Sequence, residues 1–140
     1  MSLEINEKLL RGTRDSDIAR DGRVKKNAFL PRANGKDRDG LSVSVLNKTY
    51  RELHLRKYLI AGHKTAVIRV GAVRSLGFDA RLAADVDDPA HALIVGIPDR
   101  TIGDGEKLQA ERSAELLASF AREYDHSLAC ETSELPEEHD

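Results

Sequence analysis

The chain has 140 residues and a formal net charge of −2 at pH 7, with 40% hydrophobic and 33% charged residues. This length suffices for one domain, and the high charge predicts a densely ionised surface around a modest core. Cys130 is the only cysteine, which excludes an internal disulfide and a thiolate zinc cluster and favours a reducing compartment. The sequence contains neither an apolar signal core nor a run near the roughly 18 apolar residues of a membrane span, so we expect a cytoplasmic protein without membrane contact.

Charge is distributed unevenly along the chain. Residues 1–75 contain 17 Lys and Arg against 8 Asp and Glu, whereas residues 76–140 contain 5 against 16. One interpretation is an anion-binding surface built by the first half. The other, which we favour, is that the two halves fold against each other and neutralise each other's fields.

The first 40 residues predict one strand followed by irregular structure. Residues 7–12 place an apolar pair beside Arg11 and end at a glycine, as a short strand does. Residues 13–23 support at most one helical turn at the surface, closed by Gly22. The apolar run 28–31 ends at a proline, and the Asn-Gly and Asp-Gly pairs that follow predict an exposed, mobile loop.

The middle of the chain predicts strands separated by helical segments. Residues 41–46 alternate apolar and hydroxyl side chains, which indicates a half-buried strand with Ser42 and Ser44 on one face. A capping box and an apolar stripe predict a helix over residues 49–61. Further along, we expect a strand over 64–70, a turn or short helix over 71–77 and an alternating strand over 78–84.

Residues 89–98, PAHALIVGIP, carry the clearest strand signal in the chain. This short apolar run, with a proline at each end, predicts the central strand of the sheet, covered on both faces. A last helix begins at Asp104 or Gly105, and its predicted buried face contains Leu117, Phe120, Ala121 and Tyr124.

The predicted fold class is α+β, with a small mixed sheet of about five strands and two main helices. These elements form a single domain over residues 1–125. Residues 126–140 are acidic and poor in large apolar side chains, so they bury too little surface to offset their ordering entropy. We therefore expect an acidic disordered tail over residues 126–140.

No catalytic or metal-binding motif of high specificity occurs in the sequence. The five histidines show no zinc-ligand spacing, and nucleophile-elbow, P-loop and dinucleotide motifs are missing, so we predict no metal and no cofactor. Cys130 in the predicted tail has nothing fixed beside it to orient a base. The basic stretch around Arg51 has few aromatic neighbours for base stacking, which makes nucleic acid a less favoured partner.

One set of polar residues is suited to an anion. If the predicted strands align, guanidinium, hydroxyl and imidazole groups converge and can donate hydrogen bonds to a phosphate or pyrophosphate. The candidate ligand-binding residues are Arg11, Arg23, Arg32, Ser42, Ser44 and His91. The alternative is that His91 is a core histidine with satisfied hydrogen bonds and that the arginines are ordinary surface charges.

The blocks DGR, NAF, GLSV and DPAHALIVG resemble small, uncharacterised bacterial proteins with similar blocks, a resemblance that implies no function. The order of an Arg-ended strand, a Phe-containing strand, a Ser-bearing strand and a late strand is more distantly similar to ADP-ribosyltransferases, which bind NAD. This second resemblance implies NAD-binding roles for Arg11 and Ser42. His91 and Asp99 stand where that family's catalytic glutamate is expected.

Two functional hypotheses follow from these patterns. The favoured one is a small binding or interaction protein, with an anionic small molecule such as a phosphate or nucleotide, or another protein, as its partner. The alternative is an ADP-ribosyltransferase-like enzyme that uses NAD. The sequence leaves open whether the protein is an enzyme and in which oligomeric state it works.

Overall fold

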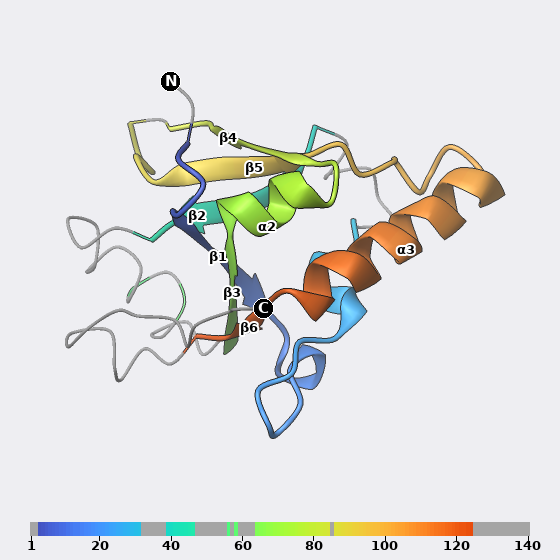
Figure 1. The fold of residues 1–140 in the computed structure, drawn as a ribbon, viewed down its shortest axis with the longest axis horizontal. Helices are drawn as coiled ribbons and strands as arrows, with labels where there is room; N and C mark the ends of the chain where they lie inside the picture. The colour runs from blue at the N-terminus through green and yellow to red at the C-terminus, as the bar shows by residue number, and fades with distance from the viewer. Residues whose placement is uncertain are drawn as a thin grey trace.

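The computed structural model describes residues 3–31, 39–46, 56, 58, 64–84 and 86–124. Six strands in this part of the chain form one sheet in the order β4-β5-β2-β1-β3-β6 (Figure 1). The strands are β1 Lys8–Thr13, β2 Leu41–Val45, β3 Lys64–Arg69, β4 Asp79–Leu82, β5 His91–Val95 and β6 Arg122–Glu123. The predicted α+β class is confirmed.

All neighbouring strands of this sheet are antiparallel. The sheet therefore differs in detail from the predicted mixed sheet of about five strands. The short connection between β4 and β5 suits antiparallel neighbours, because parallel neighbours need a crossover of about a dozen residues or more.

β1 lies inside the sheet and is covered on both faces. It pairs with β3 along its whole length and with β2 at Leu9 and Leu10. Adjacent residues of a strand point to opposite faces, yet Leu9 and Leu10 are both 0% exposed. The apolar pair at the start of the chain thus anchors the sheet from both sides.

β5 lies second from the edge of the sheet, between β4 and β2. Ala92 and Ile94 are buried on one face, whereas His91, Leu93 and Val95 are only half-buried on the other. The prediction of a central strand covered on both faces is wrong. An apolar run indicates burial, but its place in the sheet depends on which strands pair with it, and the run does not encode that.

One face of the sheet, here called the packed face, carries the larger hydrophobic core. Helices α2 Val70–Ser75 and α3 Asp104–Ser119 and the 3-10 turn η2 Lys26–Phe29 contribute side chains to it. Phe29, Val73 and Leu117 are fully buried against strand residues such as Leu9 and Ile68. This contact fixes η2 beside α3 and brings residues 26–31 close to the sheet.

The opposite face, here called the Ser42 face, is more polar. Residues directly opposite each other in a sheet share a face, and Ser44 lies opposite both Leu10 and His91. A smaller cluster of Leu10, Tyr58, Val67 and Tyr124 covers part of this face. Among the described residues, this face also carries the Ser42 hydroxyl, the His91 imidazole and the half-buried Leu93.

Two predicted elements take a different form in the structure. Ala28 and Phe29 lie in η2, so the segment read as a Phe-containing strand is a 3-10 turn. Helix α3 ends at Ser119, which leaves Phe120 45% exposed, because the following residues form β6 and pair with the open edge of β3. Asp15–Asp17 form a second 3-10 turn, η1, in which Asp17 is buried.

Several predictions concern residues outside the described part of the chain. Apart from Arg56 and Tyr58, the predicted helix over 49–61 lies there, as do most of the predicted loop after Pro31 and the predicted tail over 126–140. In the described ranges, no helix has the length and apolar character needed to cross a membrane.

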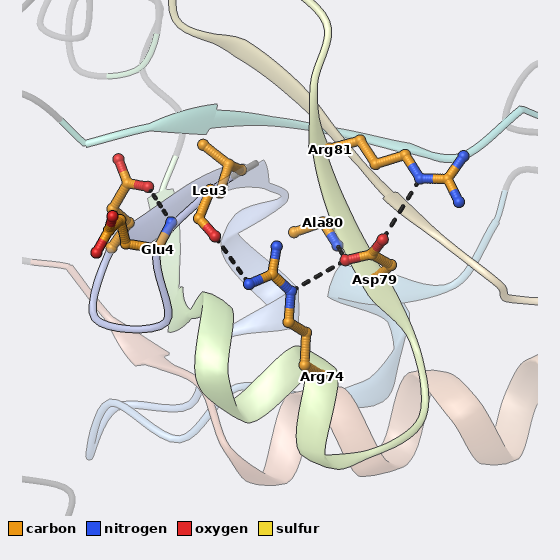
Figure 2. A network of polar contacts seen from close by, with 7 residues as sticks. Leu3, Glu4, Arg74, Asp79, Ala80 and Arg81 are labelled. Atoms are coloured by element: carbon orange, nitrogen blue, oxygen red, sulfur yellow. Dashed lines mark hydrogen bonds and ion pairs between the residues drawn. The ribbon is translucent and has the colours of Figure 1, made fainter. Parts of the chain in front are cut away.

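An ionic network joins α2 to β4 and to the N-terminal segment. Arg74 donates from Nε to Asp79 Oδ1 at 3.0 Å and from Nη1 to the carbonyl oxygen of Leu3 at 2.8 Å (Figure 2). The backbone N–H of Ala80 donates to the same carboxylate at 2.8 Å, and Arg81 donates to its second oxygen at 3.4 Å. These partners, with the Arg74 hydrogen bond as the main cause, hold the pKa of Asp79 below its usual range.

Candidate functional site

Ser42 and His91 form a hydrogen-bonded pair on the Ser42 face. The register of β2 and β5 places Ser42 opposite Leu93, so Ser42 and His91 are diagonal neighbours. Ser42 Oγ lies 3.0 Å from His91 Nε2, and His91 Nδ1 lies 3.2 Å from the carbonyl oxygen of Ala83. A carbonyl only accepts, so Nδ1 carries the proton of this bond, and Nε2 of the neutral ring accepts from the Ser42 hydroxyl.

Ser44 belongs to a buried network and not to an open site. It is 1% exposed, and its Oγ lies 2.8 Å from the hydroxyl of Tyr58. The Tyr58 hydroxyl also donates to the carbonyl oxygen of Leu10 at 3.4 Å. Tyr58 packs so closely on Gly12 that a Cβ there would lie 3.0 Å from its ring. A bound anion therefore has no access to the Ser44 hydroxyl in this arrangement.

Arg11 connects β1, η2 and β2 through its guanidinium group. It lies opposite Ala66, on the packed face, near the point where the paired part of β1 and β2 ends. Its Nε donates to the carbonyl oxygen of Ala28 at 2.6 Å, and its Nη1 donates to that of Ser42 at 2.8 Å. The local geometry thus holds the charge of Arg11 in a fixed position between three elements.

The six candidate residues do not converge on one point. Arg11 and His91 start from opposite faces of the sheet, and each of them contacts Ser42. Arg23 lies elsewhere, 79% exposed and paired with Asp21 at 3.0 Å. Arg32 lies outside the described residues. Arg11, Ser42 and His91 therefore do not share one pocket. Arg11 and His91 nevertheless each make a hydrogen bond with Ser42.

A cavity of about 1000 Å³, here called the Arg11 cavity, opens where β1, η2 and the start of β2 meet. Arg11, Ser42, Gly12 and Tyr58 all line it, whereas His91 does not. Its charged lining residues within the described part of the chain are Arg11, Arg14, Lys26 and Arg100 against Asp17 and Glu111. The cavity is therefore lined by an excess of positive charge.

Local structure positions these charges. The backbone N–H of Arg14 donates to Asp17 Oδ2 at 3.1 Å, which holds the turn that carries Arg14. Arg100 donates from Nη1 to the carbonyl oxygen of Pro31 at 3.2 Å. Within the described ranges, the exposed side chains of Arg14 and Lys26 make no ion pair. These two cations are open to a solvent anion.

A second cavity, here called the Arg23 cavity, has a volume of about 1140 Å³. Its lining includes six cations and three acids: Arg20, Arg23, Lys25, Lys26, Lys64 and Arg122, with Asp21, Glu115 and Glu123. The backbone N–H of Arg23, with its guanidinium group, lowers the pKa of Asp21. The Asp21 carboxylate consequently neutralises the candidate residue Arg23 within its own cavity.

Sequence reasoning missed Arg14, Lys26 and Arg100 as site residues. They come from the end of β1, from η2 and from the turn before α3, and no spacing in the sequence links these three segments. The excess of basic residues in the first half of the chain is a signal for Arg14 and Lys26, but Arg100 lies in the acidic second half and has no such signal.

The described residues contain no cluster of three or more His, Cys, Asp or Glu side chains suited to a metal ion. Comparison with protein-family models, curated proteins and solved structures finds no match for this chain. Functional inference therefore depends on the geometry of the two cavities and of the Ser42–His91 pair.

Proposed function

We propose that this protein is a small binding protein that holds an anionic ligand, a phosphate or nucleotide, in the Arg11 cavity. The observation that carries the proposal is the lining of this cavity by four cations and two acids. Converging cationic donors are the usual protein solution for phosphate oxygens, because charge-assisted hydrogen bonds are stronger than neutral ones. A cytoplasmic location is part of this proposal, supported by the single cysteine.

The fixed position of Arg11 supports a preorganised site. Its guanidinium group is held at 2.6 and 2.8 Å by two backbone carbonyls, so binding a ligand requires little further ordering of this side chain. Arg14 and Lys26, both exposed, supply the charges that a ligand contacts directly. The cavity volume is at the upper end of the about 300–1,000 Å³ typical of small-molecule sites.

The Arg11 cavity is a better candidate than the Arg23 cavity, although the latter has more cations. Arg23 is already paired with Asp21, and it is largely exposed, which weakens its field through solvent screening. The Arg11 cavity combines Ser42 and the partly buried Arg11 with the exposed cations Arg14 and Lys26. A ligand there meets both fixed and adaptable donors.

Calorimetric titration with inorganic pyrophosphate at fixed ionic strength tests this proposal. The double variant Arg14→Gln with Lys26→Gln should weaken binding at least about tenfold, since loss of one charge-assisted hydrogen bond costs about 1.5 kcal/mol or more. The double variant Lys107→Gln with Arg112→Gln changes two exposed residues of α3 that line neither cavity, so it is a matched charge control and should leave binding unchanged. Equal weakening by both changes would indicate a nonspecific effect of net charge and contradict the proposal.

A second candidate function is an ADP-ribosyltransferase-like activity on NAD. It is favoured by one observation, that Arg11 and Ser42, the residues which the resemblance assigns to NAD binding, line the same cavity. The 3-10 turn at Phe29 weighs against the strand order on which that resemblance depends. Incubation with NAD separates the two functions, because a transferase releases nicotinamide whereas a binding protein leaves NAD intact.

A further inference from the structure

The Ser42–His91 pair has the geometry of a nucleophile beside a general base. Ser42 Oγ is 3.0 Å from His91 Nε2, and the far side of the imidazole is oriented by the Ala83 carbonyl at 3.2 Å. A serine hydroxyl becomes a useful nucleophile when a base within about 2.6–3.2 Å can take its proton and a third group orients that base. We propose that Ser42 and His91 catalyse acyl transfer from ester substrates, a function separate from anion binding.

The sheet holds all three groups in place. Ser42 and His91 belong to β2 and β5, which pair directly through the Ser44–His91 and Ser42–Leu93 positions. The backbone N–H of Ala83 donates to the carbonyl oxygen of His91 at 2.8 Å, so the residue that orients the imidazole is itself tied to β5. A constellation on paired strands is held more tightly than one on loops.

Exposure distinguishes Ser42 from its neighbour on the same strand. Ser42 is exposed and lines the Arg11 cavity, whereas Ser44 is buried under Tyr58. The Arg11 guanidinium donates to the Ser42 carbonyl oxygen at 2.8 Å, which fixes the β2 backbone that carries the nucleophile.

The reaction balances without any further reagent except water. Ser42 Oγ attacks the ester carbonyl carbon while its proton passes to His91 Nε2, and the tetrahedral oxyanion collapses with cleavage of the bond to the leaving oxygen. The imidazolium returns its proton to that oxygen or to solvent, which leaves an acyl-Ser42 ester. A water molecule then attacks this ester, with His91 again as the base, and releases the carboxylic acid and free Ser42.

The test uses p-nitrophenyl acetate, a neutral ester, on the full chain. We expect a burst of p-nitrophenol and its anion and, after rapid acid quench and peptide mass spectrometry, one acetyl group on the peptide that contains Ser42. Ser42→Ala should abolish the labelling, and His91→Gln should reduce the labelling rate at least about 100-fold, the lower range for general-base catalysis. Ser119→Ala is the matched control, because this exposed serine bonds only to its own helix at Leu116 in the described part of the chain.

Locating the acetyl group by peptide mass spectrometry on the unaltered protein tests the proposal even if a variant fails to fold. Acetylation confined to lysines, or absent from the Ser42 peptide, would overturn the proposal, as would labelling that His91→Gln leaves unchanged. The ester carries no charge, so the Arg14→Gln and Lys26→Gln variant should still be labelled. If this variant loses pyrophosphate binding but is still labelled at Ser42, anion binding and acyl transfer are separate functions, and each proposal can fail without the other.

Discussion

The two faces of the sheet differ in what their buried side chains do. On the packed face, Leu9 and Ile68 meet Phe29 and Leu117 from η2 and α3 in a continuous apolar core. On the Ser42 face, the buried cluster around Leu10 is smaller and includes tyrosine hydroxyl hydrogen bonds. Among the described residues, the packed face therefore carries the larger apolar core, whereas the Ser42 face combines a smaller core with polar groups.

The largest expected effect concerns the packed face. Phe29→Ala should lower the free energy of unfolding by about 3–5 kcal/mol, because it removes a fully buried ring that joins η2 to the core. The comparison is Leu93→Ala on the Ser42 face, a half-buried position, where we expect a clearly smaller loss. Urea denaturation of both variants measures the difference, and equal losses would contradict the contrast between the faces.

Arg11 should contribute to the stability of the unliganded protein, because its guanidinium group joins β1, η2 and β2. Its two short hydrogen bonds to backbone carbonyls connect three elements, so Arg11→Ala should cost about 1.5–3 kcal/mol. Arg14→Ala, an exposed position at the same cavity, should change stability by less than about 0.5 kcal/mol. Similar midpoints of thermal unfolding for the two variants would show that Arg11 is an ordinary surface charge.

Gly12 tests how closely Tyr58 packs on the Ser42 face. A Cβ at Gly12 would lie 3.0 Å from the Tyr58 ring, so Gly12→Ala should cost about 1–3 kcal/mol through overpacking. Gly105→Ala near the start of α3, where a Cβ meets nothing within 4 Å, should be neutral or stabilising. If Gly12→Ala proved neutral by urea denaturation, Tyr58 would have to lie further from β1.

The smallest effect is the acid dependence of the Arg74–Asp79 pair. Hydrogen bonds lower the folded-state pKa of Asp79 below its ordinary value of 3.8, so the pair stabilises the fold above that pH. This contribution is lost as the pH falls through the lowered pKa, and it is small because the Asp79 side chain is 43% exposed. Asp79→Asn should slightly flatten the stability profile below pH 3.8; an unchanged profile would exclude the role assigned to the pair.

Local patterns predicted the strands well, because alternation and β-branched runs act at short range. Residues 41–46 and 64–70 were expected as strands, and β2 and β3 occupy almost the same residues. The position of β5 near the edge and the turn at Phe29 were not predicted, since both depend on long-range pairing and packing.

The candidate site was predicted in part. Ser42 and His91 were grouped with four other residues on the assumption that the strands align; these two are in contact because β2 and β5 are neighbours. The separation of Arg11 from His91 follows from the alternation of faces once β1 and β2 pair at Leu10 and Ser44. That register is set by tertiary packing, which a single sequence does not reveal.

The most direct test of the central claim, that a cationic cavity beside the packed sheet holds an anion, is a titration followed by NMR. Pyrophosphate added to ¹⁵N-labelled protein should shift the backbone amide signals of Gly12, Arg14 and Asn27 along one saturable curve, because these residues line the Arg11 cavity. Shifts confined to Gly22 and Lys64, which line only the Arg23 cavity, would contradict the account. Shifts that spread over all basic residues without saturation would contradict it equally.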